Sequence, residues 1–448
     1  MTSRTLAPVR AGEMPDELCE QPRPRADAVT ALSIYVAILV GVPSVLVVGP
    51  LGGAGSPAQL IGLAVLLAWG TYRLSAQTAR SHVAQPVRRV ALAFGASVLA
   101  SYIVATTRAI DGVELRAADR GILNVCAWLG IMFLAMDCIP SRARLDVLLR
   151  RLVAAGGALA SLGVVQSVTG MAFTNYIQIP GLSANNSLLA VSNRDGVVRA
   201  AGTAMHPIEF GVVLTIVLPF AIHYATNDRD RRWLRRWYPV LAICLAIPVS
   251  VSRSAVIGTA VVLIVLLPSW PRERRLRAYA AIVGAIPCVY ALSPGLLGTL
   301  KGLFTGIGND SSALSRTGSY DLAANFIARS PILGRGFSTF LPEYRILDNQ
   351  YLGTVIELGI VGLTALLLLF VMGFTTARNT RRVAADQKQR DLAQCCAAAI
   401  AAAAVSFAFF DTLSFPMAAG LVFFTLGIAS ALRRLVTEGD VHVPGAEG

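Results

Sequence analysis

The sequence predicts an all-α, polytopic membrane protein with about twelve transmembrane helices. Of its 448 residues, 55% are hydrophobic and only 15% are charged, whereas about a quarter of the residues in soluble domains are charged. The apolar residues come in blocks of about twenty, the length that crosses a bilayer core. The cations that produce the formal charge of +13 gather in short runs beside these blocks, as the positive-inside rule describes. These features exclude a soluble multidomain protein and a nucleic-acid partner.

The predicted membrane domain extends over residues 29–435. Residues 1–28 are polar and contain several Pro and Arg residues, so we expect a disordered cytoplasmic tail, and 436–448 form a second tail. A signal peptide is the alternative for the first 50 residues. The run 29–50 is too long for its apolar region and lacks a clear cleavage site, so it counts as the first span. The predicted spans are 29–50, 56–74, 90–107, 121–140, 147–169, 207–225, 238–251, 254–270, 277–293, 351–374, 392–410 and 416–432.

The connections between spans alternate in charge, which predicts that both termini are cytoplasmic. Arginines gather in one set of connections: 73–89, 142–151, 229–236, 272–277 and 378–390. The intervening connections are mixed or poor in charge: 108–120, 170–206, 294–350 and 411–415. The second set is therefore expected on the outer side.

The stretch 238–268 decides the number of spans. As one long helix it would have Arg253 in its middle and would put two arginine-rich connections outside, against the charge rule. Two short helices that turn at Ser252-Arg253-Ser254 restore the alternation and put Arg253 at a sunken turn facing outward. A charge at membrane depth is costly and usually functional. The alternative is that Arg253 caps the turn and extends toward the headgroups.

Two long outer loops, 170–206 and 294–350, are the expected location of an active site, because long loops in compact domains are often functional. Residues 317–330 predict a short amphipathic helix in the second loop. Gly334 and Gly336 predict a tight turn that brings the backbone close to a ligand or a helix.

Three outward-facing segments have chemically informative patterns. The first reads RAAGTAMHPIEFG at 199–211, and the second is the SRS turn at 252–254. The third contains SR at 315–316, PILGRGF at 331–337, DNQYL at 348–352 and ELGIVG at 357–362.

Together these segments resemble the O-antigen ligase and O-antigen polymerase family of bacterial surface-polysaccharide enzymes. Members of that family often show R-x-x-G…[HN]-P, a mid-chain S-R between short spans, and an outer loop with S-R…P-[IL]-x-G-x-G. That loop ends in H-N-x-Y-L…E-x-G-x-x-G. Two positions depart from the pattern, since Asp348 stands where the ligases usually have a histidine, and Ile208 replaces a frequent Asn. The first departure puts in doubt a ligase mechanism that depends on that imidazole.

The resemblance implies glycosyl transfer, without metal or cofactor, on the outer face of the bacterial cytoplasmic membrane. The donor would be an oligosaccharide on a polyprenyl pyrophosphate such as undecaprenyl pyrophosphate, and the acceptor would be a hydroxyl on a glycan or lipid. Membrane lipids and proteins of polysaccharide export or chain-length control are the other expected partners. The seven cysteines show no metal-ligand spacing and are interpreted as small core residues.

Arginines are the candidates for holding the pyrophosphate, because a guanidinium pairs with phosphate oxygens and stays charged. Arg253 and Arg316 are the leading candidates, followed by Arg199 and Arg335. The structural alternatives are that Arg316 pairs with a loop carboxylate, Asp310 or Asp321, and that Arg199 and Arg335 are ordinary loop charges.

Carboxylates are the candidates for activating the acceptor hydroxyl. Asp348 is the first candidate and Glu357 the second; the alternatives are an N-cap at Asp348 assisted by Asn349, and a tie from Glu357 to an arginine. His206, Asn349 and Tyr351 are the remaining candidates for substrate binding, although His206 also suits a residue at the entry of a helix.

Two further features do not add candidate residues. Asp411 lies at the end of a span, where a solvated or capping role is the ordinary interpretation. Aromatic and amide side chains in the first outer loop suit sugar binding but are equally common in folded loops: Phe173, Tyr176, Asn185 and Asn186.

The sequence thus predicts a membrane glycosyltransferase that polymerises or ligates lipid-linked oligosaccharides. Polymerisation is favoured because Asp348 replaces the histidine and because the Arg- and Ala-rich composition suits a high-GC bacterium that lacks a lipid A core. The alternative function is a transporter or flippase for a lipid-linked glycan or a small anion. A flippase should show paired halves and charges spread through many spans, and we find no such internal repeat.

Overall fold

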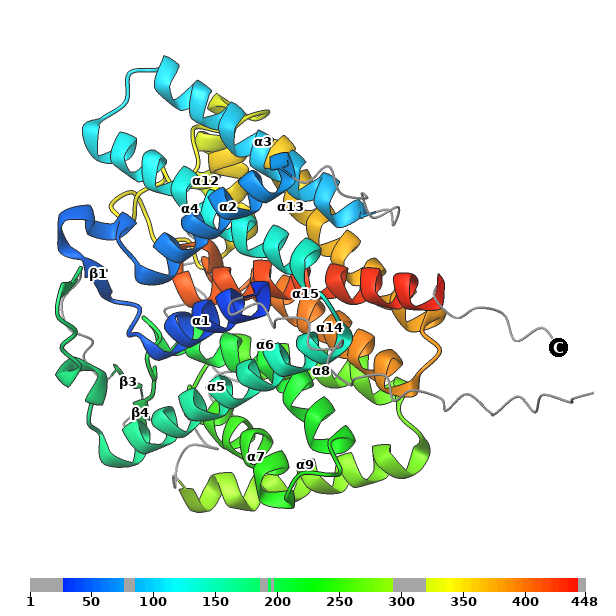
Figure 1. The fold of residues 1–448 in the computed structure, drawn as a ribbon. Helices are drawn as coiled ribbons and strands as arrows, with labels where there is room; N and C mark the ends of the chain where they lie inside the picture. Colours follow the sequence, from blue (N-terminus) through cyan, green and yellow to red (C-terminus); the bar gives the residue numbers. More distant parts are fainter. Residues whose placement is uncertain (1–26, 76–84, 186–191, 195–196, 293–319, 442–448) are drawn as a thin grey trace, which may run out of the picture.

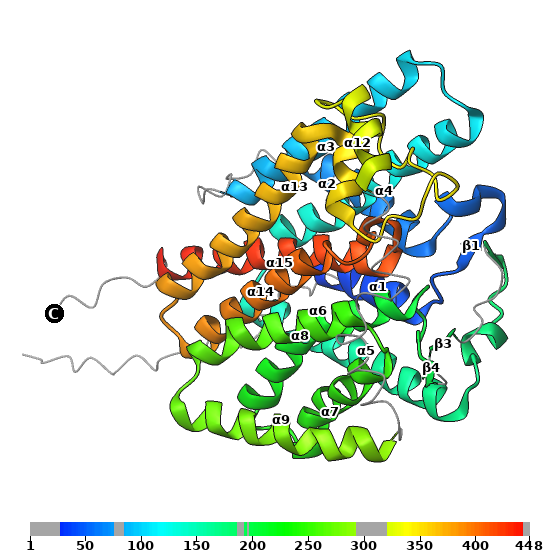
Figure 2. The ribbon, with the colours of Figure 1, turned by 180° about the vertical axis from the view of Figure 1, so that it is seen from behind.

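The protein is a bundle of helices that lie side by side, described here by a computed structural model (Figures 1 and 2). The structure describes residues 27–75, 85–185, 192–194, 197–292 and 320–441. The predicted site residue Arg316 and its possible partner Asp310 lie outside these residues, as does Asn186.

The α-helices are α1 (Ala28–Gly41), α2 (Pro57–Ser75), α3 (Pro86–Thr107), α4 (Gly112–Cys138), α5 (Arg142–Thr169), α6 (Pro207–Asn227), α7 (Trp233–Val249), α8 (Arg253–Leu266), α9 (Arg272–Leu292), α12 (Tyr320–Arg329), α13 (Gln350–Val383), α14 (Gln387–Ser406) and α15 (Pro416–Val441). The 3₁₀ turns are η2 (Gly49–Ala54), η3 (Phe173–Tyr176), η4 (Leu267–Ser269) and η6 (Thr412–Ser414). The strands are β1 (Leu46–Val48), β2 (Leu182–Ala184), β3 (Ser192–Arg194) and β4 (Val197–Arg199). They pair antiparallel, β1 with β2 and β3 with β4.

Six of the described helices are long and apolar enough to cross a membrane, namely α3, α4, α5, α6, α13 and α15. Helices α1 and α8 are apolar but shorter. This confirms a multi-pass, mostly helical protein. The count of twelve spans and the cytoplasmic location of both termini remain predictions.

The arginine-rich connections meet at one end of the bundle. Arg150 pairs with Asp228 at 2.7 Å, and Arg274 pairs with Asp391 at 3.5 Å and donates to the Thr226 hydroxyl at 3.0 Å. The α4–α5, α6–α7, α8–α9 and α13–α14 connections therefore lie together. Strands β1, β3 and β4 lie at the other end, opposite the end of α15 (Figures 1 and 2). We call that second end the loop end. The grouping agrees with the alternation of charge along the chain.

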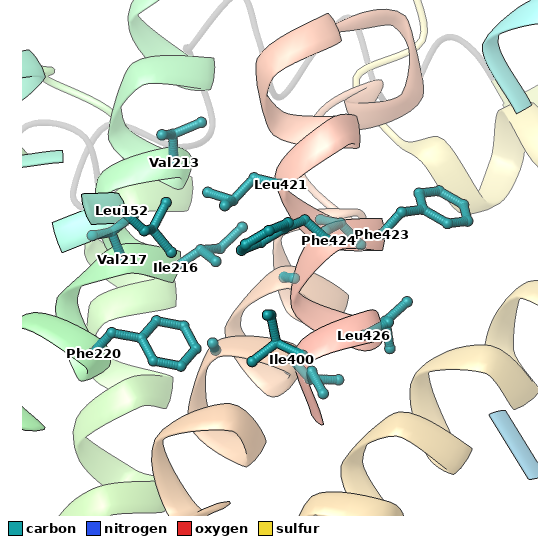
Figure 3. Packing of buried hydrophobic residues seen from close by; sticks show 14 of the residues in the cluster. Leu152, Val213, Ile216, Val217, Phe220, Ile400, Leu421, Phe423, Phe424 and Leu426 are labelled. Carbon is teal, nitrogen blue, oxygen red and sulfur yellow. The ribbon is translucent and has the colours of Figure 1, made fainter. Parts of the chain in front are cut away.

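Helices α6 and α15 form the centre of the bundle. Their apolar segments are 89% buried, against 33% for α3, which lies at the periphery. Side chains of the two helices, among them Val213 and Ile216 of α6 and Phe424 of α15, point toward one another in Figure 3. Lipid is as apolar as these side chains, so close van der Waals packing holds such helices together.

The predicted break between two short helices is confirmed, with a small shift. Helix α7 ends at Val249 and α8 begins at Arg253, so the turn covers 250–252 and Arg253 is the first helical residue after it. Val251 has a φ of 45°, which a β-branched side chain rarely adopts. Strained backbone of this kind often marks a functional turn.

Helix α13 is interrupted at Gly359, and the preceding loop completes its hydrogen bonding. Gly359 has φ 65° and ψ −167°, a conformation almost restricted to glycine. The amides of 335 and 336 donate to the carbonyls of 356 and 357, and the amides of 360 and 361 donate to the carbonyls of 331 and 332. The segment 331–336 thus replaces the missing helical bonds. Backbone groups at membrane depth need such partners because lipid offers none.

The predicted close approach of the glycine turn to a helix is confirmed. Gly334 and Gly336 have φ values of 69° and 119°. A Cβ at Gly334 would lie 2.2 Å from the carbonyl oxygen of Glu357. The absence of side chains at this turn is what allows the loop to contact α13.

The amphipathic helix predicted for 317–330 is present as α12 in the described residues. Its Ala323 is buried with Leu347 and Ile356, and its Phe326 ring packs edge-on against Phe340 at 5.2 Å. This helix therefore covers the part of α13 that precedes the interruption.

The interruption of α13 predicts opposite effects of alanine at two glycines. Gly359→Ala should lower the free energy of unfolding by at least about 2 kcal/mol, because alanine is strained there and its Cβ would lie 2.2 Å from the Ile332 carbonyl oxygen. Gly70→Ala, in the interior of α2 with no atom within 4 Å, should be neutral or slightly stabilising. Thermal unfolding in detergent measures both, and equal melting temperatures would contradict this account.

Candidate active site

A cavity of about 320 Å³ lies at the loop end of the bundle. Its walls come from α1, α2, α4, the first turns of α13 and the connection between α14 and α15, and the loop 337–347 lines it as well. Apolar side chains such as Leu39, Trp128 and Phe337 alternate there with polar ones. The cavity therefore suits a ligand that has both apolar and polar parts.

Charges of both signs line this cavity. In the described part of the chain they are Arg120, Arg345, Glu357 and Asp411. Arginines suit an anionic group such as a phosphate, and carboxylates suit a hydroxyl that must lose a proton. The cavity thus has both kinds of group that transfer from a phosphate ester to a hydroxyl requires.

Glu357 is held by the loop that completes α13. Its side chain is 8% exposed, and its Oε1 accepts the backbone N–H of Phe340 at 3.1 Å. Its carbonyl oxygen accepts from the hydroxyl of Ser101 at 2.6 Å, in addition to the Gly336 amide. The carboxylate is therefore held by a backbone amide, no ion pair joins it to an arginine among the described residues, and its side chain lies in the wall of the cavity.

Asp411 lines the cavity and was not selected from the sequence. Burial raises the pKa of Asp411 to about 6, the hydrogen bond donated by the Ser414 hydroxyl opposes that rise, and the charge of Asp348 adds to it. Asp411 occupies a short connection between two spans with no motif around it, so the sequence offers no sign that this end of the span meets α13.

The DNQY segment joins α13 to α14 and to the connection that bears Asp411. Asn349 caps α13, accepting the Leu352 amide at 3.2 Å, so the N-cap is Asn349 and not Asp348, the residue considered for that position from the sequence. The side chain of Gln350 accepts the Leu413 amide at 2.7 Å. The Tyr351 hydroxyl donates to the Ala404 carbonyl at 2.6 Å. These contacts fix the position of Asp411. Of the predicted site residues here, Asp348, Asn349 and Tyr351 are not among the residues that line the cavity.

A second group of predicted site residues gathers at the α7–α8 turn. The Arg199 guanidinium is buried and donates to the Ser250 carbonyl at 3.2 Å. His206 caps α6, its Nδ1 accepting the Ile208 amide at 3.2 Å, as expected for a residue at the entry of a helix. Burial, with the charge of Arg199, lowers the pKa of His206 to about 4, so the ring is neutral at pH 7. Arg253 begins α8 beside this group.

The group at the α7–α8 turn lies next to the cavity. Met205 lines the cavity directly before His206, whose ring lies 6.2 Å from that of Phe415, and Pro416 lines the cavity again. Glu209 is fully buried and accepts the amides of residues 205, 417 and 418 at 2.8–3.1 Å. It thus holds the start of α15 against the segment 199–211.

Arg335 is part of an ion cluster that holds the outer loop to the α3–α4 connection. Glu114 is 3% exposed and pairs with Arg335 and, at 2.5 Å, with Arg108, and it accepts the hydroxyl of Tyr344. The Arg335 guanidinium also lies over the rings of Phe326 and Tyr344, at 4.7 and 5.0 Å. These contacts favour the structural alternative for Arg335.

Arg120 is a cavity residue that a sequence signal could have identified. The predicted fourth span began at residue 121, but α4 begins at Gly112. Asp111 is its N-cap and accepts the Val113 amide at 3.0 Å, with Glu114 three residues after the cap. This spacing of an N-cap aspartate and a glutamate is a known start signal. It would have put Arg120 inside a helix.

Within the described residues, no group of three or more His, Cys, Asp or Glu side chains could hold a metal ion. Residues 238–367 match the family model described as O-antigen ligase. The matched segment includes Arg253, Arg335, Asp348 and Glu357, and it confirms the resemblance that the motifs predicted. No curated protein matches the chain.

The Glu114 cluster predicts a large loss of stability on neutralisation. Glu114→Gln should lower the free energy of unfolding by about 2–4 kcal/mol, because it leaves Arg108 and Arg335 without their carboxylate partner in a mostly buried site. The matched control is Glu273→Gln, whose partner Arg277 is 81% exposed, and it should have almost no effect. Thermal unfolding of both variants in detergent tests this, and similar melting temperatures would exclude a stabilising cluster.

Proposed function

We propose, from the match of residues 238–367 to the O-antigen ligase family model, that this protein is a membrane glycosyltransferase. It transfers oligosaccharide from a polyprenyl pyrophosphate to a hydroxyl of a glycan or lipid acceptor. The reaction takes place at the loop end, which faces the outside of the cytoplasmic membrane of a bacterium.

The observation that carries this proposal is the cavity with two carboxylates and two arginines. Asp411 and Glu357 lie in the same cavity as Arg120 and Arg345, between apolar walls. A polyprenyl pyrophosphate needs cations at its leaving group and apolar surface for its chain, and the acceptor hydroxyl needs a base.

The reaction is a single displacement at the anomeric carbon of the donor sugar. The acceptor hydroxyl loses its proton to a carboxylate, and its oxygen forms a bond to C1. The bond between C1 and the phosphate oxygen breaks, and its electron pair leaves on the pyrophosphate, whose charge the arginines stabilise. A single displacement of this kind inverts the configuration at C1.

Asp411 is the favoured proton acceptor, because it lines the cavity and its pKa of about 6 leaves it ionised yet basic near neutral pH. Asp348, the candidate from the sequence, acts on Asp411 through its charge. Arg253, at the start of α8, and Arg199, which donates to the carbonyl of Ser250 in the α7–α8 turn, supply positive charge beside the cavity. Arg316, the other leading candidate from the sequence, lies outside the described residues.

Polymerisation of lipid-linked repeats is favoured over ligation. Asp348 stands in place of the histidine of the ligases, and the Arg- and Ala-rich composition suits a bacterium without a lipid A core. The transporter alternative has less support. A second hollow, at the opposite end, is lined by three arginines of α13 and one of α14, and among the described residues it shares no lining residue with the first cavity.

Deletion of the gene in the source bacterium should abolish long surface polysaccharide and accumulate single lipid-linked repeats. Arg253→Ala at equal protein level should not restore chain length, and Arg253→Lys should restore it only in part, because lysine retains the charge without the planar fork. Gel electrophoresis of the polysaccharide and mass spectrometry of the lipid fraction measure these results. Unchanged long chains in the deletion strain, without a redundant enzyme, would exclude a polymerase.

The assignment of the base predicts a particular pH dependence. The rate of elongation in membrane vesicles should rise with pH through about 6, because Asp411 must be ionised to accept a proton. Asp411→Asn should reduce the rate about 100-fold or more. Ser414→Ala should move the rise to higher pH, since it removes a hydrogen bond that favours the ionised form.

The variant Asp348→Asn distinguishes the role of Asp348 from that of Asp411. Loss of its charge should lower the pKa of Asp411 and move the rise in rate to lower pH. An inactive Asp348→Asn beside an active Asp411→Asn would instead make Asp348 the base.

A further inference from the structure

The wall of the cavity formed by α2 contains a buried amide without a hydrogen-bond partner. Gln59 lines the cavity and is 7% exposed, and its Nε2 has no partner among the described residues. A buried donor left unpaired costs the full free energy of removing it from water. Natural proteins rarely retain such a group without a reason, and a ligand in the cavity that supplies an acceptor is one.

The side-chain amides of two further residues also line the cavity. No hydrogen bond joins the side chain of Asn124 or of Asn185 to another described residue. Asn124 belongs to α4, and Asn185 follows β2, where its backbone amide donates to the Val45 carbonyl at 2.9 Å. Three amides from three separate elements are therefore available to one ligand.

The amides adjoin one of the arginines. The guanidinium of Arg120 and the side-chain nitrogen of Asn185 both lie against Gly53, at 2.5 and 3.3 Å from where its Cβ would be. In a lipid-linked glycan the first sugar is bonded directly to the pyrophosphate. A group that binds the sugar must therefore lie beside one that binds the phosphate, as Asn185 lies beside Arg120.

The wall is rigid and has an aromatic surface. Helices α2 and α4 are in backbone contact, since a Cβ at Gly130 would lie 2.5 Å from the carbonyl oxygen of Gly62. Trp128 lines the cavity and is fixed by stacking on Phe423, with ring centroids 5.4 Å apart. A fixed aromatic ring beside amides suits the apolar face and the hydroxyls of a sugar, and rigidity lowers the entropic cost of binding.

We propose that the α2–α4 wall and the adjoining Asn185 form a sugar-binding subsite, in which Gln59, Asn124 and Asn185 bind hydroxyls of the lipid-linked oligosaccharide. The inference rests on the proposed glycosyl transfer and divides the cavity into a sugar-binding wall and a charged side. Gln59 acts there as a substrate-binding residue whose amide finds its partner only when the glycan is bound.

The test uses the opposite signs that Gln59→Leu should have on stability and on function. Leucine removes the unpaired polar group at similar volume, so the melting temperature of the purified full-length protein should rise by about 1–3 °C. In the gene-deletion strain, the same variant should yield about tenfold less long polysaccharide than wild type and accumulate lipid-linked repeats, because a hydrogen bond to the sugar is lost.

The matched control is Thr376→Val. Thr376 is 2% exposed and its hydroxyl is also unpaired among the described residues, but it lies about five helical turns along α13 from Glu357. This variant should raise the melting temperature and leave polysaccharide length unchanged.

Three results would overturn the subsite. Wild-type polysaccharide from Gln59→Leu would show that the amide binds no sugar, and a lower melting temperature would show that the amide has a structural role. A third result, a deletion strain with unchanged polysaccharide, would remove the proposed function itself and the subsite with it. The first two results would contradict the subsite but not glycosyl transfer. Failure of the subsite can therefore be distinguished from failure of the proposed function.

Discussion

The interruption of α13 at Gly359 is the constraint on which the rest of the loop end depends. A helix at membrane depth cannot leave backbone groups unpaired, so the break exists only because residues 331–336 lie in it and replace its hydrogen bonds. The same contacts place the loop 337–347 in the wall of the cavity and bring the Phe340 amide to Glu357. One local departure from helical geometry thus determines where the loop 337–347 lines the cavity and where the carboxylate of Glu357 lies in it.

Buried polar ties extend this arrangement to the surrounding elements. Glu114 fastens the outer loop to the α3–α4 connection through Arg335, Gln350 fastens α13 to the connection that bears Asp411, and Glu209 fastens α15 to the segment 199–211. Each of the three accepts from groups that would otherwise be unsatisfied away from water, so each tie is specific as well as stabilising. These ties fix the positions of the elements whose side chains line the cavity.

The cavity combines features that act on different parts of one substrate. In the proposed reaction, its arginines bind the charge of a pyrophosphate, its carboxylates accept the proton of an acceptor hydroxyl, and the amides that line it bind a sugar. The residues around Arg199 and the α7–α8 turn lie next to the cavity, where the ring of His206 packs near that of Phe415. The proposed glycosyl transfer requires these three kinds of group, and the segment that matches the O-antigen ligase family model includes the loop and the first turns of α13 that line the cavity.

The sequence by itself determined the membrane class, the existence of a break near Arg253, the amphipathic helix α12 and the glycine turn at 334–336, because each depends on local composition, periodicity or chirality. It also identified Glu357 through a motif. Only the tertiary structure decided that Asp411, Arg120 and Gln59 share a cavity with it, and that Arg335 and Tyr351 hold the scaffold. Those assignments depend on which helix ends meet in space. Meetings of this kind result from packing between segments hundreds of residues apart, and no local pattern records them.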